Sequence, residues 1–168
     1  MGYVCDTQMS LCIPPADIVK TAGTWTTSLS ANVVKEDRTP ADGVFNLIVP
    51  LGVTGNSASF KGARIKRVDL LYKVSGGACD SIPTVEVEKV TFSAGGTASG
   101  AALAATLDSG HDTDAKRKAL GDHRMMVTLT SPAWLDDDEA CYLYVNVDAS
   151  ATTQFALYGA VVYFDLRL

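Results

Sequence analysis

Short stretches in which apolar and polar residues alternate constrain the fold of this chain most. In CYLYVNVD, from Cys141 to Asp148, the two tyrosines, Asn146 and Asp148 fall on one side, and the leucine and two valines fall on the other. The segment TVEVEKVTF alternates in a similar way. Because successive side chains of a strand point to opposite faces, this period of two predicts half-buried β-strands.

Such runs recur between turn residues from Ile18 onward. We predict strands over residues 18–28, 30–36, 44–51, 57–60, 64–74, 83–93, 102–107, 123–130, 140–148 and 154–167. The last of them contains FALYGAVVYFDL, which is almost wholly apolar, as expected of a strand that is buried on both faces.

Only one segment is typical of a helix. DTDAKRKALGD offers Asp112 or Thr113 as N-cap, good helix formers through Leu120, and Gly121 as a stop, which predicts about two turns. Many short strands with one short helix favour an all-β fold. We predict a single antiparallel β-sandwich of jelly-roll or related Greek-key topology.

The first segment, Met1 to Ala16, has two adjacent prolines and no periodicity, so we expect an extended arm there. The predicted organisation is an N-terminal arm over residues 1–17 and one β-sandwich domain over 18–168. No stretch approaches the roughly 20 apolar residues of a membrane span. MGYVCDTQMSLCIPP also lacks a basic region followed by an apolar core, so we expect neither membrane insertion nor export by a standard signal peptide.

The formal net charge of −5 argues against a nucleic-acid partner, because affinity for nucleic acids comes mainly from Lys and Arg that neutralise phosphates. The one basic cluster, KGARIKR from Lys61 to Arg67, alternates with apolar residues. We interpret it as the solvated face of a strand, with an anionic partner as the alternative.

Four cysteines, Cys5, Cys12, Cys79 and Cys141, have neither CxxC spacing nor a histidine partner in a zinc-finger register. A structural zinc site is therefore not expected. We expect free or buried thiols. The alternative is at least one disulfide acquired after release from the cell, with Cys5–Cys12 and Cys79–Cys141 as the simplest pairings.

Both histidines, His111 and His123, lie in DSGHDTDAKRKALGDHRM, each beside an aspartate. The predicted helix separates them, so they approach each other only if the connection folds back on itself. The spacing matches no zinc motif and lacks a third nitrogen or sulfur ligand. We expect a capping and solvating role for this polar segment, with a metal site or a pH sensor as the alternative.

A second acidic cluster lies in LDDDEA: Asp136, Asp137, Asp138 and Glu139. Adjacent carboxylates repel one another, so they must be well hydrated or share a cation. We expect a solvated hairpin turn, with a weak calcium site as the alternative. No other cofactor is expected.

The sequence contains no GxSxG elbow, P-loop or GxGxxG motif after a strand, and no cysteine in a nucleophile context, so we do not expect an enzyme. A carbohydrate-binding module would use exposed aromatic side chains as stacking platforms. Tyr142 and Tyr144, on one strand face, could serve as such a platform, although packing in the core or an interface is the simpler interpretation.

The order TAGTW, RTPADGVFNLIVPL, KGARIKRVDLLYKV, LDSGHD, HRMMVTLTSPAWLDDDEACYL and LYGAVVYFDLRL resembles small β-sandwich proteins encoded among the structural genes of tailed bacteriophages and their metagenomic relatives. The resemblance covers most of the chain from about Ile18. It implies a virion component that decorates or cements a capsid, and it transfers no functional residues.

On this interpretation the chain forms homo-oligomers, with trimers around a three-fold favoured, contacts a major capsid or other virion protein, and is located in the virion. Residues 1–17 would reinforce a subunit interface. Two alternatives remain open: a carbohydrate-binding or receptor-binding module, and an extracellular filament subunit with head-to-tail contacts.

Overall fold

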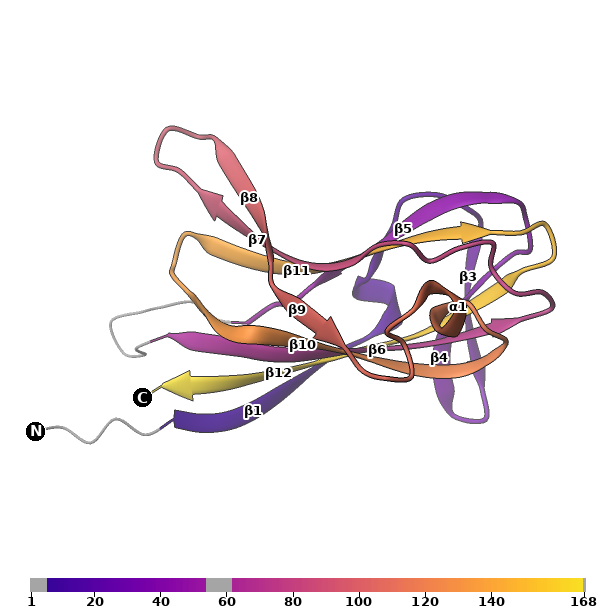
Figure 1. Ribbon diagram of the computed structural model, residues 1–168, viewed down its shortest axis with the longest axis horizontal. Coiled ribbons are helices and arrows are strands. Elements are labelled where there is room, and N and C mark those ends of the chain that lie inside the picture. Colours follow the sequence, from indigo (N-terminus) through magenta and orange to yellow (C-terminus); the bar gives the residue numbers. More distant parts are fainter. Residues whose placement is uncertain (1–5, 54–61, 168) are drawn as a thin grey trace, which may run out of the picture.

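Two antiparallel sheets stack as a sandwich in the computed structural model, which describes residues 6–53 and 62–167 (Figure 1). Sheet A has seven strands: β1 (Asp6–Ile13), β3 (Trp25–Ser30), β4 (Val33–Arg38), β6 (Ala63–Ser75), β9 (Ala105–Leu107), β10 (Gly121–Leu135) and β12 (Gln154–Arg167). Sheet B has five: β2 (Val19–Lys20), β5 (Gly43–Pro50), β7 (Val85–Phe92), β8 (Ala98–Leu103) and β11 (Glu139–Ala149). The predicted all-β sandwich is confirmed.

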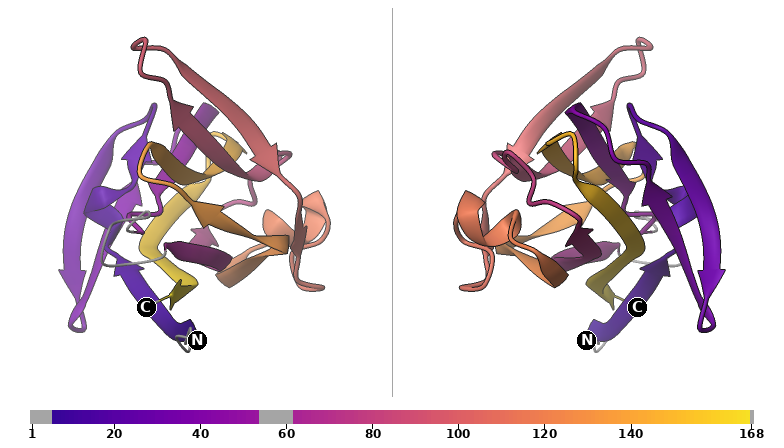
Figure 2. Two further views of the ribbon diagram at one scale, coloured as in Figure 1. Left: turned by 90° about the vertical axis from the view of Figure 1, so that its left-hand side faces the viewer. Right: turned by 90° about the vertical axis from the view of Figure 1, so that its right-hand side faces the viewer.

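The chain crosses between the sheets many times. The strand order of sheet A is β3-β4-β12-β6-β10-β9; β1 also pairs with β12, along residues 160–167, whereas β4 pairs with residues 155–157. The strand order of sheet B is β2-β5-β11-β7-β8. The connections from β4 to β5, β5 to β6, β6 to β7, β8 to β9, β10 to β11 and β11 to β12 all change sheet. Figure 2 shows the two layers along the long axis of the sandwich. Such repeated crossing is the wiring of jelly-roll and Greek-key sandwiches.

The core lies between the sheets, where the alternation places Val, Leu and Ile from every long strand. An aromatic cluster closes one end of it: Phe45 packs edge-on against Phe155, with ring centroids 5.5 Å apart, and against Trp25 at 5.4 Å. The ring of Tyr72 stacks on Phe155 at 5.1 Å. Phe45, Phe155 and Tyr72 are buried and therefore unavailable to a ligand, whereas Trp25 is partly buried at the edge of this cluster.

Most predicted strands are confirmed, with two instructive breaks. The predicted strand 18–28 is split into β2 and β3 by a turn at Gly23, whose φ of +92° suits glycine. The predicted strand 102–107 begins earlier and splits at Ala104, where the chain leaves sheet B as β8 and joins sheet A as β9. The predicted strand 57–60 lies outside the described residues.

Only two short helices occur in the described part of the chain: the 3-10 turn η1 (Pro15–Asp17) and α1 (Asp114–Arg117). The predicted helix is thus present, with Thr113 as N-cap, but it is shorter than predicted because the chain bends after Lys118 to enter β10. Among the described residues, no helix is long and apolar enough to cross a membrane.

Residues 6–13 of the predicted arm form strand β1, which pairs with β12 over its whole length, from Asp6↔Arg167 to Ile13↔Ala160. We expected no regular element there. At the end of this ladder the backbone of Ile13 lies close to Gly159. A Cβ at position 159 would lie 2.5 Å from the carbonyl oxygen of Ile13, so only glycine fits there. Residues 1–5 of the arm lie outside the described residues.

Candidate functional site

The two histidines contact each other. The chain folds back through α1, so that His111 Nε2 lies 3.1 Å from His123 Nδ1. At one end of this pair, His111 Nδ1 lies 2.9 Å from each carboxylate oxygen of Asp108. At the other end, His123 Nε2 lies 2.9 Å from the carbonyl oxygen of Ala119. The four groups form one chain of hydrogen bonds.

The ring protons follow from the partners of this chain. The Ala119 carbonyl and the Asp108 carboxylate can only accept, so the ring nitrogen that faces each of them carries a proton. Between the rings, His111 Nε2 and His123 Nδ1 share a hydrogen bond when one of the two nitrogens carries the proton.

This network has a structural role. Asp108 also accepts backbone N–H groups of Gly110 and Met126, each at 2.8 Å. Burial raises the pKa of its carboxyl, but these two N–H groups and the His111 ring outweigh burial and hold the pKa below its usual value. The His123 ring stacks on Tyr72, with centroids 4.7 Å apart. The polar segment is thereby fixed to the core. The expected capping and solvating role is not what the structure shows, because Thr113 makes no side-chain capping hydrogen bond and His111 is buried.

In the acidic cluster, residues 136–138 form the turn between β10 and β11, and Glu139 is the first residue of β11. Glu139 Oε1 accepts a hydrogen bond from the Lys89 ammonium at 2.6 Å, and Oε2 accepts one from the N–H of Asp136 at 3.0 Å. Lys89 holds the pKa of the Glu139 carboxyl below its usual value. Lys89 of β7 thus provides a cation for one carboxylate of this cluster, and the weak calcium site stays a prediction.

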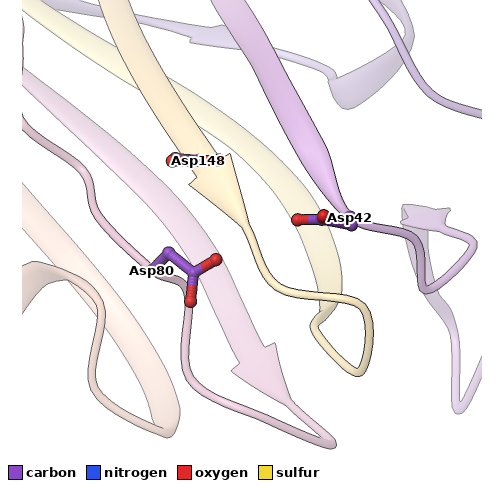
Figure 3. Close-up of side chains that lie close together, drawn as sticks. All are labelled: Asp42, Asp80 and Asp148. Atoms are coloured by element: carbon purple, nitrogen blue, oxygen red, sulfur yellow. The ribbon is translucent and has the colours of Figure 1, made fainter.

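Three other carboxylates come together from separate parts of the chain. Asp42 precedes β5, Asp80 follows β6, and Asp148 lies near the end of β11 (Figure 3). One oxygen of each lies within 4.8 Å of the others, and among the described residues this is the one such group of three potential ligands. A divalent cation such as Ca²⁺ prefers oxygen ligands, which this group could supply. Sequence reasoning missed it because no spacing links the three positions.

The expectation of free or buried thiols is confirmed for the three described cysteines, and the alternative pairing of Cys79 with Cys141 is not formed. Both are free buried thiols, and Cys12 is a free exposed thiol. Ser81, two residues after Cys79, pairs with Asp148 of β11. Asp148 is seven residues along the strand from Cys141, a distance of roughly 23 Å, so the two thiols are far apart. Burial raises the pKa of Cys79 and of Cys141 to about 11, so neither is a reactive thiolate. The pairing of Cys5 with Cys12 involves a residue outside the described range.

The outer face of sheet A is covered by ion pairs. Asp69 is fully buried beneath Arg67 and Arg124, whose Nε and Nη2 atoms lie 2.8 and 2.7 Å from its carboxylate oxygens. Arg67 also lies over the Tyr163 ring, 4.2 Å from the centroid. The Arg67 guanidinium thus forms a cation–π contact with the Tyr163 ring, which stays partly exposed.

At the end of β12, the same face continues in a second ion-pair network. Asp165 binds Arg64 at 2.7 Å, while Asp6 of β1 binds Arg167 at 2.8 Å. Arg64 and Arg167 both lie over the ring of one surface aromatic residue, Trp134, 5.3 and 4.3 Å from its centroid. Part of the basic KGARIKR segment is therefore a strand face paired with acidic side chains of this chain.

The outer face of sheet B carries partly exposed tyrosines with a different set of neighbours. Tyr142 and Tyr144 project outward from β11, as the alternation predicts, while Leu143 and Val145 are buried. Each tyrosine stands between a β5 residue and a β7 carboxylate. The cross-strand rows are Ile48–Tyr144–Glu86 and Pro50–Tyr142–Glu88. We call these six residues the tyrosine platform.

Hydrogen bonds along β11 hold part of this face in place. The Tyr144 hydroxyl donates to Asn46 Oδ1 at 2.9 Å, and Asn146 Nδ2 donates to the same oxygen at 2.6 Å. Asn46 therefore orients the Tyr144 ring. In Figure 1, strands β5, β7 and β11 form the upper layer, and the β7–β8 hairpin rises from it.

No protein-family model matches the chain, and no curated protein matches it. Among solved structures, it is similar to a carbohydrate-binding module, TmCBM61, solved with β-1,4-galactotriose: 8% identity, TM-score 0.39, covering 92% of this chain and 86% of that one. A family 29 carbohydrate-binding module from Piromyces equi gives 11% identity and TM-score 0.38, covering 94% and 91%. The Agl-KA catalytic domain is 10% identical with a TM-score of 0.36, and the match covers 94% of this chain and 27% of that one. Scores below 0.5 give no basis for transferring a function.

Proposed function

We propose that this protein is a non-catalytic carbohydrate-binding β-sandwich and that the tyrosine platform on sheet B is its binding surface. The observation that carries the proposal is the pair of rows Ile48–Tyr144–Glu86 and Pro50–Tyr142–Glu88 on one sheet face. A sugar ring has an apolar C–H face and a hydroxyl rim. A tyrosine ring beside hydrogen-bonding side chains is complementary to both.

Rigidity supports this assignment. The two tyrosines of the platform lie on β11, the central strand of sheet B, and the other four residues lie on its neighbours β5 and β7, so no platform residue lies on a loop. Asn46 orients the Tyr144 ring through its hydroxyl. A surface that is already ordered loses little side-chain entropy on binding, so even weak stacking yields measurable affinity.

The other aromatic residues support the choice by exclusion. Phe45, Phe155 and Tyr72 are buried in the core, and the partly buried Trp25 packs edge-on against Phe45. On sheet A, arginine side chains lie over Trp134 and Tyr163. The tyrosine platform is therefore the described surface at which two adjacent aromatic rings stand on one strand face without a guanidinium over them.

A glycan array followed by NMR titration of the best ligand tests the proposal. Tyr142→Ala and Tyr144→Ala should each weaken binding roughly tenfold or more, because truncation of a central aromatic contact typically costs about 2 kcal/mol. Tyr158→Ala is the matched control, since Tyr158 is a partly exposed tyrosine on sheet A. Absence of binding to every glycan, or binding that both platform variants retain, would reject this function.

A second candidate is the self-associating virion subunit, and strand β1 is the feature that favours it. Met9 and Leu11 share a side of β1 with buried Ile13, yet they are 44% and 38% exposed. An exposed apolar edge strand is suited to pairing with another chain. In this proposal copies of the chain, or a capsid protein, cover that edge.

Light scattering after size exclusion separates the two candidates. A subunit that assembles through β1 should form a discrete oligomer that the double variant Met9→Lys, Leu11→Lys converts to a monomer, because lysine protects edge strands against pairing. Tyr142→Ala should leave that oligomer intact. A monomer at every concentration would argue against assembly and leave glycan binding as the remaining function.

A further inference from the structure

We propose that the tyrosine platform prefers glycans that carry protonated amines, such as oligomers of β-1,4-linked glucosamine, over neutral and acidic glycans. This inference rests on the proposed function and concerns the ligand class of the same site. It follows from the charges that surround the two tyrosine rings.

The carboxylates are cross-strand neighbours of the rings. Tyr144 pairs with Glu86 and Tyr142 pairs with Glu88 in the β7–β11 ladder. Directly opposed residues of an antiparallel pair have Cβ atoms about 5 Å apart. Glu86 is exposed and Glu88 is partly exposed, so both carboxylates can reach a ligand that lies on the rings.

A carboxylate beside a tyrosine face is suited to an ammonium group. The ring face attracts a cation through its quadrupole, and the carboxylate adds an ion pair and accepts the N–H donors. The platform repeats this combination twice. Because Glu86 and Glu88 are two strand residues apart, roughly 7 Å, a ligand needs amines on more than one sugar to use both.

The charge of the face points the same way. Outward positions of β5, β7 and β11 carry Glu86, Glu88 and Asp148, and these described strands place no lysine or arginine on that side. Lys89 faces the opposite side of β7, where it binds Glu139. An acidic glycan would meet carboxylates without a counter-charge, so the platform should reject uronic-acid polymers.

Three oligomers of equal length provide the test: a glucosamine oligomer at a pH at which its amines are protonated, its N-acetylated form, and a uronic-acid oligomer. Affinity is measured by NMR titration at low and high salt. The glucosamine oligomer should bind tightest, and salt should reduce its advantage because exposed charges are screened. Glu86→Gln and Glu88→Gln should each lower its affinity roughly 2- to 5-fold.

Asp122→Asn is the matched control, since it removes the same charge from an exposed aspartate of sheet A, whose side chain is 71% exposed. It should leave the preference unchanged. Equal binding of the amine and N-acetyl forms, or a preference that survives both glutamate variants, would overturn this inference. If neutral glycans still bind and Tyr142→Ala abolishes that binding, only the amine preference fails; if no oligomer binds, the proposed function fails too.

Discussion

The outer faces of the two sheets use similar residues in opposite ways. On sheet A, arginines lie over Trp134 and Tyr163, and the acidic side chains are paired with cations of the same face. On sheet B, Glu86 and Glu88 flank Tyr142 and Tyr144 with no arginine or lysine among the outward residues of the central strands. One face satisfies its charges internally, while the other leaves charge and aromatic surface for a ligand.

Asp69→Asn should produce the largest change in stability, because Asp69 is fully buried and holds both Arg67 and Arg124. Losing hydrogen bonds to a buried charge costs about 2 kcal/mol, or roughly 4–8 °C in Tm for a chain of this size. Thermal unfolding followed by circular dichroism measures it. Glu86→Gln on sheet B should leave Tm nearly unchanged, and equal losses from both variants would remove the contrast between the faces.

The second-largest change in stability should come from acid, which protonates carboxylates on sheet A. Arg64 and Lys66 hold the pKa of the Asp165 carboxyl below its usual value of 3.8, and Arg167 does the same for Asp6. Since these pKa values are lower in the folded chain, their stabilisation is present above about pH 4 and is lost as the pH falls through the folded values. Tm measured from about pH 6 to about pH 2 should therefore fall steeply at the acid end.

Asp165→Asn should flatten this acid limb by removing one of the groups that take up a proton on unfolding. Its Tm at neutral pH should be lower than that of the unchanged chain. An acid limb of the same steepness in Asp165→Asn would show that the loss arises elsewhere, with Asp108 as the next group to replace, because its pKa is also lowered.

The smallest predicted change in Tm is an increase, in contrast to the decreases predicted above. Asp80→Asn removes one of three carboxylates whose oxygens lie within 4.8 Å of one another. In a chelating buffer, relief of like-charge repulsion should raise Tm by roughly 1–2 °C. Scanning calorimetry resolves such a shift. A lower Tm would mean that Asp80 makes a favourable interaction that outweighs the repulsion.

Alternation in the sequence predicted the strands well because each long strand has one buried side. It placed Tyr142 and Tyr144 on one face and fixed β11 within a residue at each end. The same alternation does not specify which strand lies beside which. The pairing of Tyr144 with Glu86, which defines the candidate site, depends on sheet order, and so does the meeting of Asp42, Asp80 and Asp148.

Contacts made by loops were harder to predict. His111 and His123 meet because α1 ends after one turn and sends the chain back, and the helix formers through Leu120 suggested a longer helix. The Cys79–Cys141 pairing failed for a related reason: the loop that holds Cys79 lies beside the far end of β11. Local patterns describe elements, whereas these contacts depend on where the elements are placed.

The ladder between β1 and β12 brings Asp6 and Arg167 side by side, so both ends of the described chain leave the sandwich at one corner of sheet A (Figures 1 and 2). The tyrosine platform looks outward from the other sheet. A domain whose ends lie together can be inserted into a loop of a larger protein without covering its proposed binding surface. For the same reason a circular permutant with new termini at the Ala31–Asn32 turn should leave that surface open.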